Sequence, residues 1–345
     1  MTAARKMRVA IITPNPTPYR APFFRALARS DRVGLKVFFL TRGSATRPWT
    51  VELDGFDHEF LKEWSIPIGG KDMARYRVNP SVISRLYRGC FDAVAIAGYN
   101  HFTTQAAILY CIVTRTPWCL MSESHVAKPR GAARVLLKKV FLGPVLRSMG
   151  AAMVTGTLAR LYVESLGVPR ENAFVVANTP DVAFFHEAAA ALGPRRDSIR
   201  TRLGVAGKRV ILFVGRFIEE KGLRVLFDAY GKAQTRRGDL ALLLVGDGVR
   251  RAHYESLARQ QRLDGVQCLG FRTQQELPDI YCAADVFVLP SLVEPWGVVV
   301  NEAMACGLPV IVSDQVGASA DLVIEGSNGF IVPAQRQLKA SMISL

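Results

Sequence analysis

Short apolar runs alternate with longer stretches of helical periodicity along most of the chain, the pattern of parallel strands joined by crossover helices. In the first half this pattern predicts helices over 21–30 and 101–114. Strands are predicted over 8–13, 34–40, 92–97, 118–122, 151–155 and 173–176. In the second half it predicts a helix over 223–233 and strands over 209–214, 240–245, 284–290 and 310–313. Segment 41–80 has no long period and predicts loop with short strands.

A chain of 345 residues is too long for one ordinary core. An Asn-Thr-Pro-Asp turn at 178–181 and a Gly-Pro-Arg-Arg-Asp stretch at 193–197 are typical of a connection between domains. The sequence therefore predicts an α/β protein with a first domain over 1–180, a linker over 181–200 and a second domain over 201–345.

The second domain holds the most informative stretch, 284–314, which is predicted as strand, loop, short helix and strand. Pro295 and Gly297 suit the start of the helix, Gly307 suits the left-handed position after its end, and Pro309 prevents continuation. The free N–H groups near Gly297 and Val298 would then lie at the carboxyl end of a strand. Such a helix start favours an anion.

Two glutamates flank this predicted anion site. Glu302 would lie roughly 7.5 Å along the helix, whereas Glu294 stays in the preceding loop. Ionised carboxylates only accept hydrogen bonds, so hydroxylated groups are their natural partners. A diphosphate between two hydroxylated rings is a nucleotide sugar, which we take as the hypothesis. Two glutamates eight residues apart also occur on ordinary solvated surfaces.

The loop after strand 209–214 reads Gly215-Arg216-Phe-Ile-Glu-Glu-Lys221-Gly222. Its glycines permit close backbone approach, and its two cations beside a helix start can balance a diphosphate. No Gly-Lys-Ser/Thr is present, which excludes a Walker loop.

The segment EPWGVVVNEAMACGLPVIVSDQVGASADLVIEGSNGFIVP, with its Glu294-x7-Glu302 pair, resembles the donor site of retaining glycosyltransferases of family GT4, which have the GT-B fold. The resemblance implies two Rossmann-like doubly wound domains facing across a cleft. It implies donor phosphates on Arg216 and Lys221, the donor sugar on Glu294 and the ribose on Glu302.

By the same resemblance, Gly270 and Phe271 belong to a loop that cradles the nucleotide base through its backbone, although Phe271 can equally fill core. The family continues for several tens of residues past the segment that matches 330–333. The terminal helix therefore looks truncated here.

Acceptor residues are expected in the first domain. Its Pro-Tyr-Arg run resembles one branch of the family, which makes Tyr19 and Arg20 candidate acceptor contacts. His101, Glu123 and His125 follow predicted parallel strands, so they are candidates for steering or deprotonating an acceptor hydroxyl. Each of these three can instead cap the helix that follows.

Charge adds a partner to this picture. Residues 1–180 hold 25 Lys and Arg against 11 Asp and Glu, whereas the remainder holds 19 against 18. The first domain is therefore expected to face something anionic. The family often works at the inner membrane face on lipid-linked acceptors, and segment 128–142 is basic on one face and apolar on another. A generally basic soluble protein is the alternative.

Other partners and cofactors are not indicated. Basic residues are not interleaved with aromatics as in RNA-binding proteins, and no Asp-x-Asp metal motif follows a strand. The six cysteines lack CxxC spacing and are predicted to be small buried residues of a reducing cytoplasm, and no segment suggests a signal peptide or a membrane span. Two other functions stay open, a nucleotide-sugar epimerase of the same fold and an inactive truncated sugar-binding scaffold.

Overall fold

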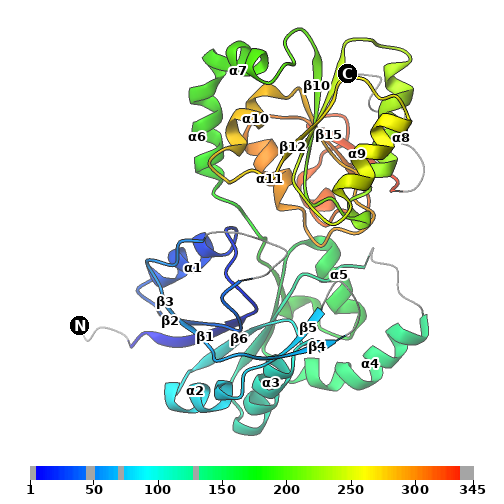
Figure 1. Cartoon of the computed structure of the whole chain (residues 1–345). Coiled ribbons are helices and arrows are strands. Elements are labelled where there is room, and N and C mark those ends of the chain that lie inside the picture. Colours follow the sequence, from blue (N-terminus) through cyan, green and yellow to red (C-terminus); the bar gives the residue numbers. More distant parts are fainter. Residues whose placement is uncertain (1–4, 44–50, 69–73, 127–131, 335–345) are drawn as a thin grey trace. The chain divides into compact units, whose positions relative to one another are not determined.

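The computed structural model describes residues 5–43, 51–68, 74–126 and 132–334, with side chains described outside 65–77 and 127–139. The chain divides into two compact units, Met1–Asn178 and Thr179–Leu345 (Figure 1). Among the described residues, no helix is long and apolar enough to cross a membrane. The ending expected to be truncated, residues 335–345, lies outside the described residues.

The first unit is built on a parallel sheet with the order β3-β2-β1-β6-β7-β8-β9. Its strands are β1 (Met7–Thr13), β2 (Val33–Phe39), β3 (Asp57–Phe60), β6 (Ala93–Ala97), β7 (Trp118–Ser122), β8 (Ala151–Val154) and β9 (Ala173–Val175). An antiparallel pair, β4 (Trp64–Ile68) and β5 (Ala74–Val78), stands apart from this sheet. The strand order reverses between β1 and β6, as in a doubly wound sheet.

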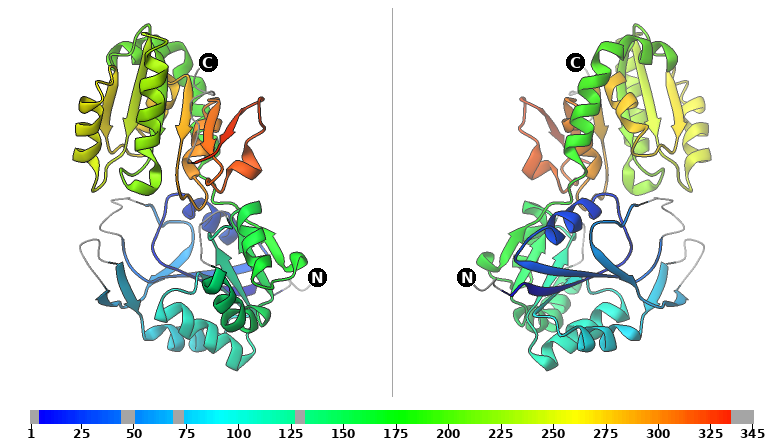
Figure 2. Two further views of the ribbon diagram at one scale, coloured as in Figure 1. Left: turned by 90° about the vertical axis from the view of Figure 1, so that its right-hand side faces the viewer. Right: turned by 90° about the vertical axis from the view of Figure 1, so that its left-hand side faces the viewer.

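Helices cover both faces of this sheet, as Figure 2 shows. They are α1 (Ala21–Ala28), α2 (Ser81–Gly89), α3 (Phe102–Thr114), α4 (Ala132–Arg147) and α5 (Thr157–Ser165). Alternate residues of β1 enter two separate cores: Ile12 packs with residues of α2, α3, α4 and α5, and Ile11 packs with Phe24 of α1. Helices α2 to α5 thus share one face of the sheet, and α1 lies on the other.

The second unit repeats the plan with the parallel order β12-β11-β10-β13-β14-β15. Its strands are β10 (Arg209–Val214), β11 (Leu240–Val245), β12 (Val266–Gly270), β13 (Val286–Leu289), β14 (Val310–Ser313) and β15 (Gly329–Val332). Its helices are α6 (Val182–Leu192), α7 (Arg196–Arg202), α8 (Leu223–Gln234), α9 (Arg251–Gln260), α10 (Leu277–Ala283), α11 (Val298–Ala305) and α12 (Ser319–Leu322). Here the strand order reverses between β10 and β13.

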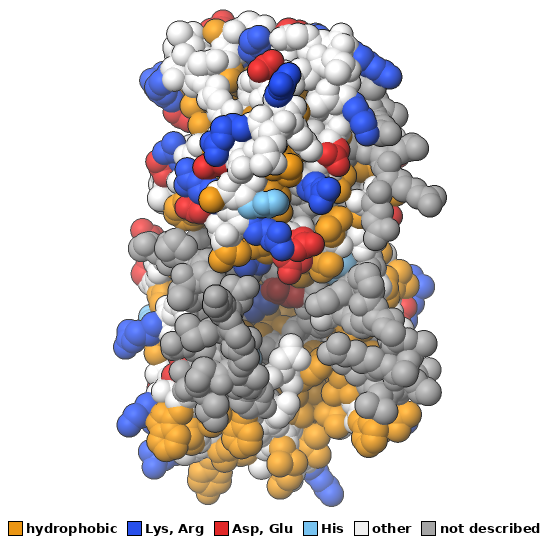
Figure 3. Space-filling view, turned by 45° about the vertical axis from the view of Figure 1, so that its right-hand side comes forward, with side chains coloured by type: hydrophobic (Ala, Val, Ile, Leu, Met, Phe, Trp, Pro, Cys, Tyr) orange, Lys and Arg blue, Asp and Glu red, His pale blue; other side chains and the backbone are white. Residues whose placement is uncertain are grey.

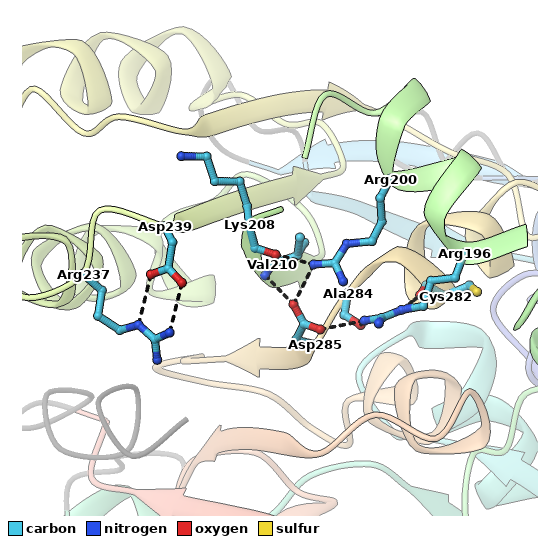
Figure 4. A network of polar contacts seen from close by, with 9 residues as sticks. All are labelled: Arg196, Arg200, Lys208, Val210, Arg237, Asp239, Cys282, Ala284 and Asp285. Carbon is cyan, nitrogen blue, oxygen red and sulfur yellow. Dashed lines mark hydrogen bonds and ion pairs between the residues drawn. The ribbon is translucent and has the colours of Figure 1, made fainter. Parts of the chain in front are cut away.

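A partly exposed ion network joins α7 to the amino ends of β10 and β13 (Figure 4). Asp285 accepts hydrogen bonds from Arg196 at 2.6 Å, from Arg200 at 2.9 Å and from the backbone N–H of Val210 at 2.7 Å. Burial raises the pKa of Asp285, but the Val210 and arginine hydrogen bonds outweigh it and leave that pKa below its usual value. The carboxylate therefore connects α7, β10 and β13 through its hydrogen bonds.

The parallel strands and crossover helices predicted from the sequence are confirmed in both units. The stretch expected as a linker, 181–200, is helical in α6 and α7 and belongs to the second unit. The prediction of buried cysteines is wrong for Cys90, which is exposed where α2 ends in a left-handed residue with φ of 44°. Cys90 itself is the left-handed residue after α2, and this turn leaves its side chain in solvent.

Candidate functional site

Two loops flank the point where the strand order of the second unit reverses, the place where doubly wound sheets bind ligands. One loop follows β10 and the other follows β13. The two loops approach closely at Gly222, which has a φ of +69°. A Cβ at this position would overlap the carbonyl oxygen of Pro290, so only glycine permits the contact. The backbone N–H of Leu292 also donates to the carbonyl of Glu220 at 2.7 Å. The loops thus form one rigid edge.

Helix α11 begins at this edge. Its N-cap is Gly297, with φ of 96°, and an added Cβ would lie only 3.0 Å from Val316 and 3.2 Å from Leu289. Only glycine fits this combination of backbone angle and space. The preceding Glu294 is fixed through its backbone, which donates to Gln315 at 3.2 Å and accepts from Gly317 at 3.0 Å. The N–H of Val300 donates to the Gly297 carbonyl at 2.8 Å, so the N–H groups of Val298 and Val299 come before the first hydrogen bond of the helix.

Lys221 and Glu294 meet across the two loops. Their side chains form an ion pair, and only 14% and 12% of the two side chains is exposed. The pair therefore places a partly desolvated cation beside the start of α11. The structure thus brings together Lys221, Glu294, Gly297 and Val298, which the sequence assigned to one nucleotide-sugar site.

Glu302 lies on the same helix, directed to α10. It accepts a hydrogen bond from the hydroxyl of Tyr281 at 2.8 Å. Burial raises the pKa of Glu302 to about 7, against the opposing effect of the Tyr281 hydrogen bond. Tyr281 is fully buried, and burial with the neighbouring carboxylate raises its pKa well above its usual value. Sequence reasoning missed Tyr281, since no spacing rule joins it to a residue on another helix.

The remaining predicted donor residues lie on neighbouring loops of the same unit. Gly215 follows β10 and donates to Val245 at 2.9 Å, and the partly buried Arg216 comes next in the loop that reaches Lys221. Gly270 ends β12 and accepts from Gly246 at 2.8 Å. Phe271 is 43% exposed and so does not fill core.

In the first unit, Arg20 and Glu123 form an ion pair at the carboxyl edge of the sheet. Arg20 Nη2 lies 2.5 Å from Glu123 Oε1, and its Nη1 donates to Thr13 at 2.8 Å. The Asn178 amide donates to the same Glu123 oxygen at 2.9 Å. Arg20 is 11% exposed and Glu123 35% in their side chains. The cluster fixes a carboxylate that still reaches solvent.

The other predicted acceptor residues are placed differently. His101 is the N-cap of α3, and its backbone N–H donates to Thr104 Oγ1 at 3.3 Å in a capping box. His125 is buried in the loop after β7, with 1% of the residue exposed. Tyr19 is partly buried beside Arg20. The structure thus joins Arg20 to Glu123 and gives His101 the capping role that the sequence left open.

Metal ligands do not gather in the described part of the chain, where no group of three His, Cys, Asp or Glu side chains could hold an ion.

Parts of the sequence are similar to known glycosyltransferases. Residues 195–345 match the family model for glycosyl transferases group 1. The chain is 32% identical over 143 residues to alpha-D-kanosaminyltransferase of Streptomyces kanamyceticus, covering 41% of this chain and 37% of that protein. It is 34% identical over 179 residues to GDP-mannose-dependent alpha-mannosyltransferase of Mycobacterium tuberculosis, covering 52% and 42%. The chain thus spans about two fifths of the length of these relatives.

Solved structures resemble nearly the whole chain. Anabaena HepE in complex with UDP and glucose has a TM-score of 0.69 at 20% identity, covering 98% of this chain and 89% of that one. Sucrose-phosphate synthase from Thermosynechococcus elongatus has a TM-score of 0.68 at 20% identity, covering 98% and 88%. The chain has the GT-B fold seen in these structures, and its residues 195–345 are similar to the glycosyl transferases group 1.

Proposed function

We propose that this protein is a retaining, hexosyltransferase-type glycosyltransferase of family GT4. It would move a sugar from a nucleotide-sugar donor to an acceptor hydroxyl. The observation that carries the proposal is the joint placement of the Lys221–Glu294 pair and the start of α11 at the switch point of the second sheet. The match of residues 195–345 to the group 1 family and the UDP named in the HepE structure support the nucleotide-sugar donor.

In this proposal the diphosphate lies against the first N–H groups of α11. Lys221 then exchanges its contact with Glu294 for the phosphates, because a diphosphate carries more negative charge than one carboxylate. Glu294 is released to accept hydroxyls of the donor sugar, and Glu302 accepts ribose hydroxyls. Arg216 adds a second cation at the phosphates.

Catalysis would consist of stabilising the departing nucleoside diphosphate as its negative charge develops. Lys221, Arg216 and the α11 dipole supply that stabilisation, while the acceptor hydroxyl attacks the face that the diphosphate leaves. Because these groups do the work of a divalent cation, we expect turnover to survive chelation by EDTA.

On the acceptor side we propose that Glu123 orients the attacking hydroxyl. Arg20 and Asn178 both donate to one oxygen of this carboxylate, which leaves its second oxygen for a ligand. Tyr19 would contact the acceptor next to Arg20. The buried His125 would shape the pocket, and His101 would act through the position of α3.

We further propose that the protein assembles a polysaccharide or glycoconjugate at the inner membrane face. Helix α3 supports this, because its solvent side is apolar: Leu109 is 61% exposed, Ile112 39% and Val113 73%. On the neighbouring α2, Tyr87 is 73% exposed. Hydrophobic side chains gather at the end of the first unit that is drawn lowest in Figure 3.

Charge selects an anionic bilayer as the partner of this α2–α3 face. Neither helix contains Asp or Glu, and Arg88 and Arg115 are exposed at the ends of α2 and α3. A second copy of the chain would bring these cations against like charge, whereas anionic headgroups would pair with them. Apolar side chains would enter the acyl boundary. The segment that the sequence suggested, 128–142, lies mainly outside the described side chains.

A sedimentation assay tests the membrane step. The protein should pellet with vesicles of phosphatidylcholine and phosphatidylglycerol but not with phosphatidylcholine alone. Replacing Leu109 and Val113 by serine should abolish pelleting, whereas Leu161→Ser, an exposed position on α5, should not. Equal pelleting of all variants, or a change only in oligomeric state by ultracentrifugation, would refute the membrane step.

A product assay tests the transfer itself. The protein is incubated with a panel of nucleotide sugars and acceptors, and NMR reports the anomeric configuration of any product. We expect glycoside with the configuration of the donor. Conversion of donor without acceptor would indicate the epimerase, and specific donor binding without turnover would indicate the sugar-binding scaffold.

A further inference from the structure

A surface pocket of the first unit lies apart from Arg20 and Glu123 and has no role in the proposed transfer. It opens at the carboxyl ends of β2 and β3 with a volume of about 360 Å³. Its lining residues are Thr41, Arg42, Phe60, Leu61, Lys62 and Glu63. Ligands of doubly wound sheets bind along this edge, so the position itself suits a substrate.

The planar guanidinium of Arg42 lies against an aromatic ring. Its guanidinium lies over the ring of Phe60, 4.7 Å from the centroid. The same ring stacks on Phe39 at 5.3 Å and 28° and meets the ring of His58 edge to face at 5.8 Å. Stacking holds the guanidinium plane and leaves its N–H edge for a planar anion. A carboxylate or phosphate can then accept two parallel hydrogen bonds.

One buried amide joins the two segments that line the pocket. Asn79 is 1% exposed and donates to the carbonyls of Leu40 at 3.0 Å, Leu61 at 3.3 Å and Lys62 at 3.1 Å. Thr103 donates to its carbonyl oxygen at 2.9 Å, which fixes the amide orientation. The two segments that carry Arg42 and Lys62 are therefore held together before any ligand arrives, which lowers the ordering cost of binding.

Charge in the pocket favours an anion. Arg42 and Lys62 are both exposed, and within the described residues no ion pair engages either of them. Glu63 is the acidic member of the lining. The first half of the chain also carries most of the net charge of +15, so its field attracts an anionic ligand.

The sheet register relates this pocket to the proposed acceptor hydroxyl. Thr13, which holds Arg20, pairs with Phe39, and Phe39 pairs with Phe60. Neighbouring strands lie about 4.8 Å apart. Thr13, which accepts from Arg20, is therefore roughly 10 Å from Phe60, whose ring contacts Arg42. A ligand extending along this edge can reach both.

We propose that Arg42, Lys62 and Phe60 form a subsite for an anionic group, a carboxylate or a phosphate, on the acceptor saccharide. The proposal rests on the proposed glycosyltransferase function, since it names the acceptor class for that reaction. Acceptors would be uronic acid or phosphate-bearing sugars, and neutral sugars would bind more weakly.

Calorimetric titration of the full chain tests the subsite with three probes: cellobiose, its uronic acid counterpart glucuronosyl-glucose, and glucose 1-phosphate. We expect one or both anionic probes to bind about ten-fold or more tightly than cellobiose, as hydrogen bonds to charged groups suggest. Which anionic probe binds more tightly identifies the carboxylate or the phosphate as the preferred group.

The variant Arg42→Gln with Lys62→Gln should remove this preference. Arg170→Gln, an exposed cation just before β9, is the matched control and should keep it. Equal binding of charged and neutral probes by the parent, or an unchanged preference in the double variant, would overturn the subsite. Thermal shift with nucleotide sugars is recorded on the same samples, so that loss of the donor site is distinguished from loss of the subsite.

Discussion

Glu302 gives a prediction in which stability depends on pH. Its carboxyl has a pKa of about 7 in the folded protein, against a usual value of 4.5. A raised pKa means that the folded state favours the protonated form. The free energy of unfolding is therefore not reduced by Glu302 below pH 4.5, and it decreases as the pH rises from 4.5 to about 7. The shift corresponds to about 3 kcal/mol at 1.36 kcal/mol per pKa unit, as an upper bound because Glu302 is partly exposed.

The perturbation is Glu302→Gln, which keeps the shape and an oxygen for Tyr281 but cannot ionise. Urea unfolding at pH 8 should show the variant more stable by about 1 to 3 kcal/mol. At pH 4 the two proteins should be within error of each other. Glu187→Gln, at an exposed position on α6, should change the free energy of unfolding equally at both pH values. A Glu302→Gln effect that does not depend on pH would refute the reasoning.

Two further predictions concern the frame of the second unit. Gly222→Ala should lower the free energy of unfolding by about 2 to 4 kcal/mol in urea titrations, because its Cβ meets Pro290 as well as a left-handed backbone. Gly307 has a φ of +79° but open space around an added Cβ, so Gly307→Ala should cost about 1 kcal/mol. Equal losses of unfolding free energy in the two variants would contradict the close contact at Gly222. Asp285→Asn should cost about 1 to 3 kcal/mol by leaving the charged hydrogen bonds of Arg196 and Arg200 without their carboxylate. Since the pKa of Asp285 is lowered, its contribution to stability is present above pH 3.8 and is lost as the pH falls below that value. The unfolding free energies of the parent and Asp285→Asn should therefore converge at acid pH. A constant difference between them would contradict this.

Local patterns in the sequence were sufficient for the secondary structure around the donor site. The strand over 209–214 is observed as β10, Gly297 lies at the predicted start of α11, and Gly307 takes the left-handed angle predicted after its end. These features depend on backbone angles and on apolar periodicity, which neighbouring residues determine. They can therefore be predicted without knowledge of the tertiary structure.

Contacts between distant segments could not be predicted in the same way. Arg20 and Glu123 are 103 residues apart, and the sequence identified each as a candidate without showing that they pair. Glu302 was expected to face a ribose, but its hydrogen bond to Tyr281 depends on how α10 and α11 pack. The contact of Arg42 with Phe60 requires β2 and β3 to be neighbours in the sheet. Segment 41–80 has no hydrophobic period that predicts this pairing.

The central claim is that Lys221 and the start of α11 hold a diphosphate. Calorimetric titration of the parent, Lys221→Met and the control Lys208→Met with a nucleotide sugar found by thermal-shift screening tests it most directly. We expect Lys221→Met to weaken binding about ten-fold or more, as loss of a charged hydrogen bond implies, and Lys208→Met to bind like the parent. Equal affinity of Lys221→Met and the parent would contradict the account.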